Sequence, residues 1–130
     1  MIQEGSVFFL KGTEPSPHYH ILLFRDPSGQ DKTSIAVYIT SRTTMPDQTC
    51  EFNEGDEFFI EMYSWVKYRN CKLLFDIDLS HFKPLGVVST ETLEKIKTGF
   101  RTALKDGKII GDVKSTFLRW EDNRLYNSMH

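Results

Sequence analysis

Short hydrophobic runs separated by turn-forming residues dominate the first two thirds of the chain. β-Branched and aromatic residues fill the runs, and Gly, Pro, Asn and Asp fill the gaps, which is typical of strands joined by turns. The predicted strands cover residues 6–10, 20–24, 33–39, 50–52, 57–62 and 64–68, with 71–76 as a further candidate. The pattern thus predicts five to seven short strands.

The second run begins with two histidines and becomes apolar on both sides. Alternation along a strand divides the side chains into two sets, Tyr19, Ile21 and Leu23 on one face and His18, His20, Leu22 and Phe24 on the other. A strand that is apolar on both faces is expected to be central and buried. Residues 11–17, with two prolines and a glycine, are predicted to form the loop before it.

One later segment has the period of an amphipathic helix. Its apolar positions follow a 3.6-residue spacing and are Leu93, Ile96, Phe100, Ala103 and Leu104. Ser89 or Thr90 can cap its N-terminus, and Gly107 is a suitable stop. We therefore predict a helix over about 90–105. Beyond it, residues 116–120 fit either a strand or a helical turn.

The order of these elements predicts a mainly β, α+β protein. A strongly curved antiparallel sheet or small barrel over about 5–88 would be closed on one side by the helix. We expect a single domain over 1–130, with 109–130 as a C-terminal extension.

Composition narrows the class of protein. The 130 residues are 39% hydrophobic and 26% charged, which excludes a disordered chain and a disulfide scaffold. A formal net charge of −2 does not indicate nucleic-acid binding by bulk charge, although a local basic patch remains compatible with it. Cys50 and Cys71 are expected to be free thiols. With neither a signal peptide nor a membrane span in the sequence, we expect a cytoplasmic protein without a membrane partner.

His18 and His20 are the first candidates for chemistry. Three interpretations remain open from the residues alone: an acid–base pair, metal ligands, or polar residues at the start of a strand. A metal site needs at least one more ligand, and no spacing favours His81, Asp47 or Asp56. We therefore predict no metal and no cofactor.

Two further clusters have polar and cationic side chains. Thr40, Ser41 and Arg42 end a predicted strand and suit phosphate contacts, although a solvated turn has the same composition. If the predicted strand 64–68 is continued to residue 69, strand alternation places Trp65, Lys67 and Arg69 on one face. Such a stripe suits single-stranded nucleic acid and equally an exposed edge strand.

The order of the segments resembles the MazF/PemK family of toxin ribonucleases, which share an SH3-like barrel with CcdB. The motifs that carry the resemblance are Gly5–Leu10, His18–Leu22, Val37–Ser41, Ser64–Val66 and Gly86–Ser89 followed by the predicted helix. Each motif alone is weak, and their order over about residues 5–106 carries the weight. The pattern is similar to a divergent branch of PemK-like proteins.

The resemblance implies a homodimer, a small antitoxin protein as partner, and metal-independent cleavage of single-stranded RNA. The family's catalytic threonine corresponds to Thr40, whereas His18 stands where the family has a catalytic arginine. We expect His18, His20 and Thr40 to carry the chemistry. The expected phosphate or RNA contacts are Ser41, Arg42, Ser64 and Lys67. The alternative is an inactive barrel that binds protein or nucleic acid.

Overall fold

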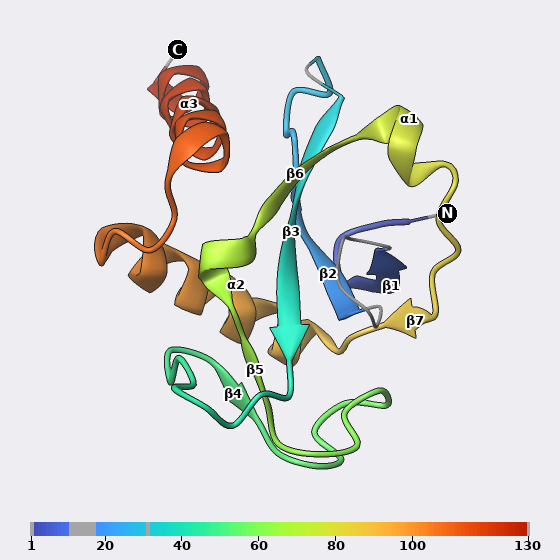
Figure 1. Ribbon diagram of the computed structural model, residues 1–130. Helices are drawn as coiled ribbons and strands as arrows, with labels where there is room; N and C mark the ends of the chain where they lie inside the picture. Colours follow the sequence, from blue (N-terminus) through green and yellow to red (C-terminus); the bar gives the residue numbers. More distant parts are fainter. Residues whose placement is uncertain (1, 11–17, 31, 130) are drawn as a thin grey trace.

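The computed structural model describes residues 2–10, 18–30 and 32–129. The predicted loop over 11–17 lies outside the described residues. The described chain forms one seven-stranded sheet with helices against it (Figure 1). The strands are β1 (Ser6–Leu10), β2 (His18–Arg25), β3 (Thr33–Thr40), β4 (Glu51–Phe52), β5 (Ser64–Val66), β6 (Lys72–Phe75) and β7 (Gly86–Val87).

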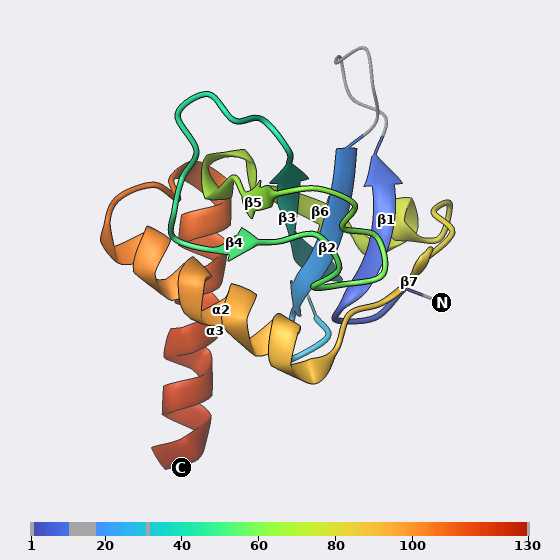
Figure 2. The same cartoon turned by 90° about the horizontal axis from the view of Figure 1, so that it is seen from below.

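Strand β3 is the centre of the sheet. One edge of β3 pairs with β2, and the other edge pairs with β6 over Thr33–Ala36 and then with β5 at Ile39 and Thr40. The remaining strands extend the path to the order β4-β5-β3-β2-β1-β7, and the strand pairings among the described residues are all antiparallel. β5 and β6 pair with different parts of the same edge of β3, and the sheet curls into a half-barrel (Figures 1 and 2). The protein is thus a sheet-rich α+β protein.

The helical elements are η1 (Tyr68–Asn70), α1 (Asp76–Leu79), α2 (Thr90–Lys105) and α3 (Gly111–Met129). Helix α2 confirms the predicted helix. Its N-cap is Ser89, whose Oγ accepts a hydrogen bond from the Thr92 amide at 3.1 Å. The chain leaves the helix at Gly107, whose φ of 77° suits glycine. None of the described helices combines the length and apolar character needed to cross a membrane.

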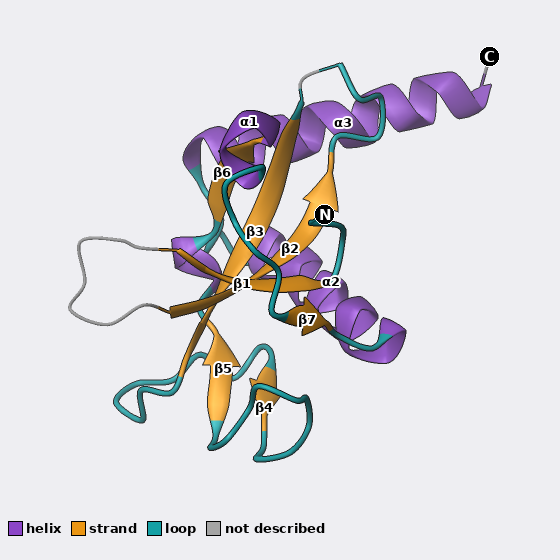
Figure 3. Ribbon diagram, turned by 90° about the vertical axis from the view of Figure 1, so that its right-hand side faces the viewer, coloured by secondary structure: helices purple, strands orange, loops and turns teal. Residues whose placement is uncertain are grey.

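Helix α3 settles the open prediction for 116–120, which is helical rather than extended. Its buried residues, Val113, Thr116, Phe117 and Trp120, all lie in the first half. The residues from 122 to 129 are exposed, and this half projects from the fold (Figure 3). The buried face is therefore short, which explains why no long helical period was visible in the sequence.

One strand prediction is wrong, and another strand is shorter than predicted. Residues 57–62 form a loop, because local turns satisfy the backbone there: the Gly55 amide bonds to the Ile60 carbonyl at 2.9 Å, and the Ile60 amide bonds to the Glu57 carbonyl at 3.0 Å. The predicted strand 64–68 ends at Val66, and Tyr68 starts the short 3₁₀ helix η1. Lys67 and Arg69 therefore do not continue a strand face with Trp65.

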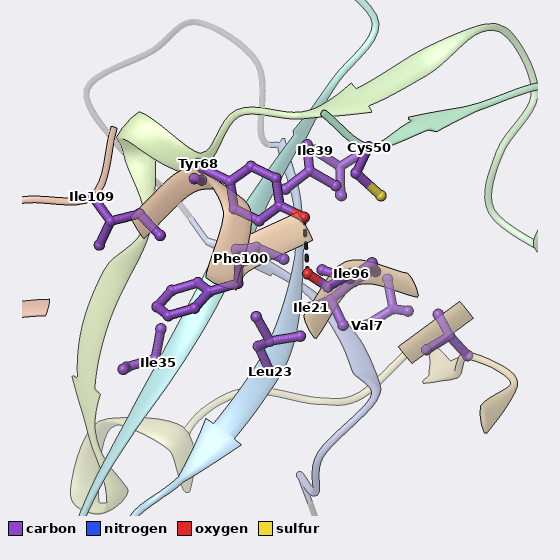
Figure 4. Close-up of a cluster of buried hydrophobic side chains, with 14 of the residues drawn as sticks. Val7, Ile21, Leu23, Ile35, Ile39, Cys50, Tyr68, Ile96, Phe100 and Ile109 are labelled. Atoms are coloured by element: carbon purple, nitrogen blue, oxygen red, sulfur yellow. Dashed lines mark hydrogen bonds between the residues drawn. The ribbon is translucent and has the colours of Figure 1, made fainter. Parts of the chain in front are cut away.

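The main core lies between the sheet and the two long helices, and contains Val7, Ile21, Leu23, Ile35, Val37, Tyr68, Ile96 and Phe100 (Figure 4). A smaller cluster on the opposite face contains Ile2, Phe8, Leu10, Leu22, Ala36 and Leu79. These two clusters bury both faces of β2, as predicted for a central strand.

A β-bulge divides strand β2 between Leu22 and Phe24. The extra residue turns Phe24 away from the histidine face, so the prediction that Phe24 extends that face is wrong. The Phe24 ring instead lies 5.2 Å from the ring of Phe100 on α2 and 5.0 Å from that of Phe117 on α3. The bulge thus gives both long helices an aromatic contact on the sheet.

Candidate functional site

The candidate site lies where β2 begins and β3 ends. His20 is paired with Tyr38, and continuing this register by two residues sets His18 opposite Thr40. The Tyr38 ring is 4.6 Å from the His18 ring and 5.3 Å from the His20 ring. The two histidines therefore share a face of β2, as the alternation predicts.

A pocket of about 210 Å³ opens at this end of the sheet. It is lined by His18, Tyr19, Ile39, Thr40, Ser41, Phe59, Ile60, Glu61, Met62 and Ser64. Four of the predicted site residues are among them. An imidazole from the start of β2, hydroxyls from the end of β3 and a hydroxyl from the start of β5 thus meet around one space.

Two of these hydroxyls have defined hydrogen bonds. Thr40 Oγ1 accepts from the Arg42 amide at 3.2 Å, and Ser64 Oγ donates to the Met62 carbonyl at 3.0 Å. A hydroxyl that accepts one bond retains its own proton for donation, and one that donates retains its lone pairs. Thr40 can therefore donate to a ligand oxygen, and Ser64 can accept from a ligand donor.

The other three predicted residues do not line the pocket. His20 is 2% exposed, with Nδ1 3.0 Å from the His18 carbonyl oxygen and its ring stacked on Phe8. Arg42 is exposed beside Ser41, and its carbonyl accepts from Trp65 Nε1 at 2.6 Å. Lys67 is half-buried, with its amide bonded to the Tyr38 carbonyl at 2.9 Å.

The loop 53–63 supplies one wall of the pocket and is tied to helix α2 by Glu57. Glu57 Oε2 accepts hydrogen bonds from Ser89 Oγ at 3.0 Å and from Thr92 Oγ1 at 2.6 Å. A carboxylate is stabilised at this end of a helix by the helix dipole. Sequence reasoning missed Glu57, because the partners that reveal its role lie 32 and 35 residues away.

The charge of the pocket differs from that of a typical phosphate site. Among the described lining residues there is no lysine or arginine, and Glu61 contributes an exposed carboxylate. His18 contributes an imidazole, a group that can accept or donate a proton, to the lining. The lining side chains can therefore act mainly through acid–base chemistry and hydrogen bonding.

Cysteine chemistry and a multidentate metal site receive no support from the described part of the chain. Cys50 and Cys71 are both free, as predicted. Burial raises the pKa of the Cys50 thiol and raises that of Cys71 to about 12, which disfavours the nucleophilic thiolate. Within the described ranges, no three His, Cys, Asp or Glu side chains gather so as to hold a metal ion.

Comparison with known proteins assigns no family to the chain. No family model matches it, and no curated protein shows significant similarity to it. Its candidate function therefore rests on the residues around this pocket.

Proposed function

We propose that this protein is a MazF/PemK-like toxin of the SH3-like, CcdB/MazF barrel type that binds and cleaves single-stranded RNA without a metal ion. The observation that supports the proposal is the convergence of His18, Thr40, Ser41 and Ser64 on one open pocket. These residues come from the segments that resemble the family's motifs.

The proposed reaction is attack of a ribose 2′-hydroxyl on the adjacent phosphorus. The new bond joins O2′ to phosphorus, and the bond from phosphorus to the 5′-oxygen breaks, which leaves a cyclic phosphate and a free 5′-hydroxyl. The 2′-hydroxyl loses a proton and the leaving oxygen gains one, so an acid–base group is needed at the reacting atoms. His18 is that group, since an imidazole can both accept and donate a proton.

The hydroxyl groups have a complementary role. Thr40 donates its proton to a phosphoryl oxygen as negative charge develops, and Ser41 and Ser64 contribute further polar contacts. Arg42 and Lys67 supply positive charge at the edge of the site rather than within it. His20 is a positioning residue: its contact with the His18 carbonyl, at 3.0 Å, fixes the backbone that carries the catalytic imidazole.

The resemblance also suggests the protein's partners. On this proposal the toxin acts in the cytoplasm as a homodimer and is held inactive by a small antitoxin protein. A small acidic protein encoded immediately upstream would support this assignment.

Cleavage of labelled single-stranded RNA in the presence of EDTA tests the proposal. We expect the wild type to cut the RNA and His18→Ala to lower the rate by about 10²–10⁴-fold, the usual contribution of a positioned acid or base. His81→Ala is the matched control, because His81 is exposed and does not line the pocket. A wild type that neither cuts RNA nor slows bacterial growth refutes the ribonuclease proposal.

The charge of the pocket favours a second candidate, an inactive barrel that binds protein or nucleic acid. Without a described lysine or arginine in its lining, and with Glu61 present, the pocket offers little stabilisation to a phosphate in the transition state. The same assay separates the two candidates. Tight binding of RNA or of a partner protein without cleavage would support the binding module.

A further inference from the structure

Four aromatic side chains form a continuous row beside the pocket. The ring centroids of Phe9 and Tyr19 are 4.6 Å apart, those of Tyr19 and Phe59 are 5.0 Å apart, and those of Phe59 and Phe58 are 5.3 Å apart. These are the separations of packed aromatic pairs. We call Phe9, Tyr19, Phe59 and Phe58 the aromatic row.

The middle of the aromatic row belongs to the pocket, and its ends face solvent. Tyr19 and Phe59 line the pocket. Phe9 is 38% exposed and Phe58 is 57% exposed. Exposed aromatic rings are costly to hydrate and commonly mark a surface that a ligand covers. The row therefore extends the pocket into a surface on which flat groups can stack.

The position of Phe58 is set by the backbone beneath it. A Cβ atom added at Gly86 would lie 3.0 Å from two carbon atoms of the Phe58 ring, so the ring rests directly on the glycine of β7. The Glu57 contacts with helix α2 hold the preceding residue. Phe58 is thus a supported ring at the surface, and stacking on it requires little reorganisation.

The carboxylate of Glu61, which lines the pocket beside the aromatic row, favours some planar ligands over others. Glu61 offers only hydrogen-bond acceptors when ionised, so it repels phosphate and favours a group that donates. The exocyclic amino groups of cytosine and adenine are such donors, whereas uracil presents two carbonyl oxygens around one N–H. The volume of about 210 Å³ is below the 300–1,000 Å³ usual for drug-sized ligands, which suits one planar group.

We propose that the pocket and the aromatic row form a subsite for unpaired nucleobases, in which the rings stack on the bases and Glu61 accepts a hydrogen bond from an exocyclic amino group. This inference rests on the proposed function, and it adds a base preference: cytosine and adenine over uracil. It also makes stacking the main source of affinity, with Arg42 and Lys67 as the cations near the site.

Fluorescence anisotropy with short labelled 2′-O-methyl oligonucleotides tests the subsite without cleavage, because the methyl group blocks the attacking hydroxyl. We expect oligocytidylate and oligoadenylate to bind about three- to tenfold more tightly than oligouridylate, the effect of one hydrogen bond. Glu61→Gln should reduce this difference. Phe58→Leu should weaken all three by about 5- to 150-fold, since it keeps an apolar side chain but removes the stacking ring.

Phe75→Leu is the matched control. Phe75 is 52% exposed but is paired with Thr33, at the opposite end of β3 from Thr40. We expect its replacement to leave binding unchanged. The slope of log K against log salt should be no steeper than about −1.4, the value for two phosphate contacts on a single strand.

The outcomes separate this inference from the function on which it rests. If the wild type cuts unmodified RNA but Phe58→Leu binds as well as Phe75→Leu, the base subsite is wrong and the ribonuclease proposal stands. Equal affinity for the three oligonucleotides overturns the role of Glu61. If the wild type binds no single strand and cuts no RNA, both proposals fail.

Discussion

Helix α2 lies close against Tyr68 at Gly99, and we predict that Gly99→Ala destabilises the protein. A Cβ atom at this position would overlap Tyr68 Oη and lie 3.0 Å from Tyr68 Cζ. The Tyr68 hydroxyl donates to the Ile96 carbonyl at 2.9 Å, and the residue is 1% exposed (Figure 4). The ring therefore cannot move aside into solvent.

The expected change in stability combines one stabilising effect with two destabilising ones. Alanine is favoured over glycine inside a helix by about 1 kcal/mol. Overpacking a tight core costs about 1–3 kcal/mol, and leaving the buried Tyr68 hydroxyl without its acceptor costs a further 1–3 kcal/mol or so. The net expectation is a loss of about 1–5 kcal/mol in the free energy of unfolding. The sign is opposite to that of the same substitution at an open helical position.

Urea unfolding followed by tryptophan fluorescence measures this loss as a lower transition midpoint. A double-mutant cycle with Tyr68→Phe tests the cause, because removing the hydroxyl relieves the worst overlap. Gly99→Ala should cost less in the Tyr68→Phe background than in the wild type. If Gly99→Ala raises the midpoint, or costs the same in both backgrounds, the proposed clash with Tyr68 is wrong.

Three other predictions concern Asp47, cysteine reactivity and Glu57. Burial acts to raise the pKa of Asp47, but hydrogen bonds from Thr49 and Lys108 and the charge of Lys108 bring the pKa below its usual value. The resulting stabilisation is present above about pH 4 and is lost as the pH falls through the folded-state pKa. Asp47→Asn should therefore lower stability at pH 7 and flatten the acid limb of a stability–pH curve. The Cys50 thiol should resist a thiol reagent at pH 8 until the protein is unfolded, because the residue is 1% exposed and burial raises its pKa; fast labelling of Cys50 in the folded protein would contradict this. Glu57→Gln should cost about 0.3–1 kcal/mol at the N-terminus of α2 and weaken RNA binding, whereas Glu54→Gln on the exposed part of the same loop should change neither by a comparable amount.

The sequence was most informative where local pattern and burial agree. The runs that became β1, β2 and β3 are apolar because both sides of the central strands are covered, so composition alone marked them. Helix α2 was visible because its buried face runs from Thr92 to Ala103 and because Ser89 caps it. His18 and Thr40 were separate candidates because each lies at a predicted strand end, and the resemblance to the toxin family is what paired them.

The errors share a physical cause, which is that tertiary contacts override local pattern. Residues 57–62 have strand composition, but Phe59 and Ile60 are buried individually from a loop. The bulge between Leu22 and Phe24 has no signal in the local sequence. It moves Phe24 to the face of β2 opposite the histidines. The aromatic row joins three separate segments, and no spacing along the chain indicates that Phe9 and Phe58 belong together.

The projecting half of helix α3 has a practical consequence for experiments with this protein. From Trp120 to Met129 the helix advances about 13 Å beyond its last buried side chain. Figures 1 and 3 show that this end points away from the end of the sheet where β3 meets β5. A dye, an affinity tag or a surface linkage attached there would stand clear of the pocket. The exposed end of α3 is thus a suitable attachment point that leaves the candidate site accessible to ligands.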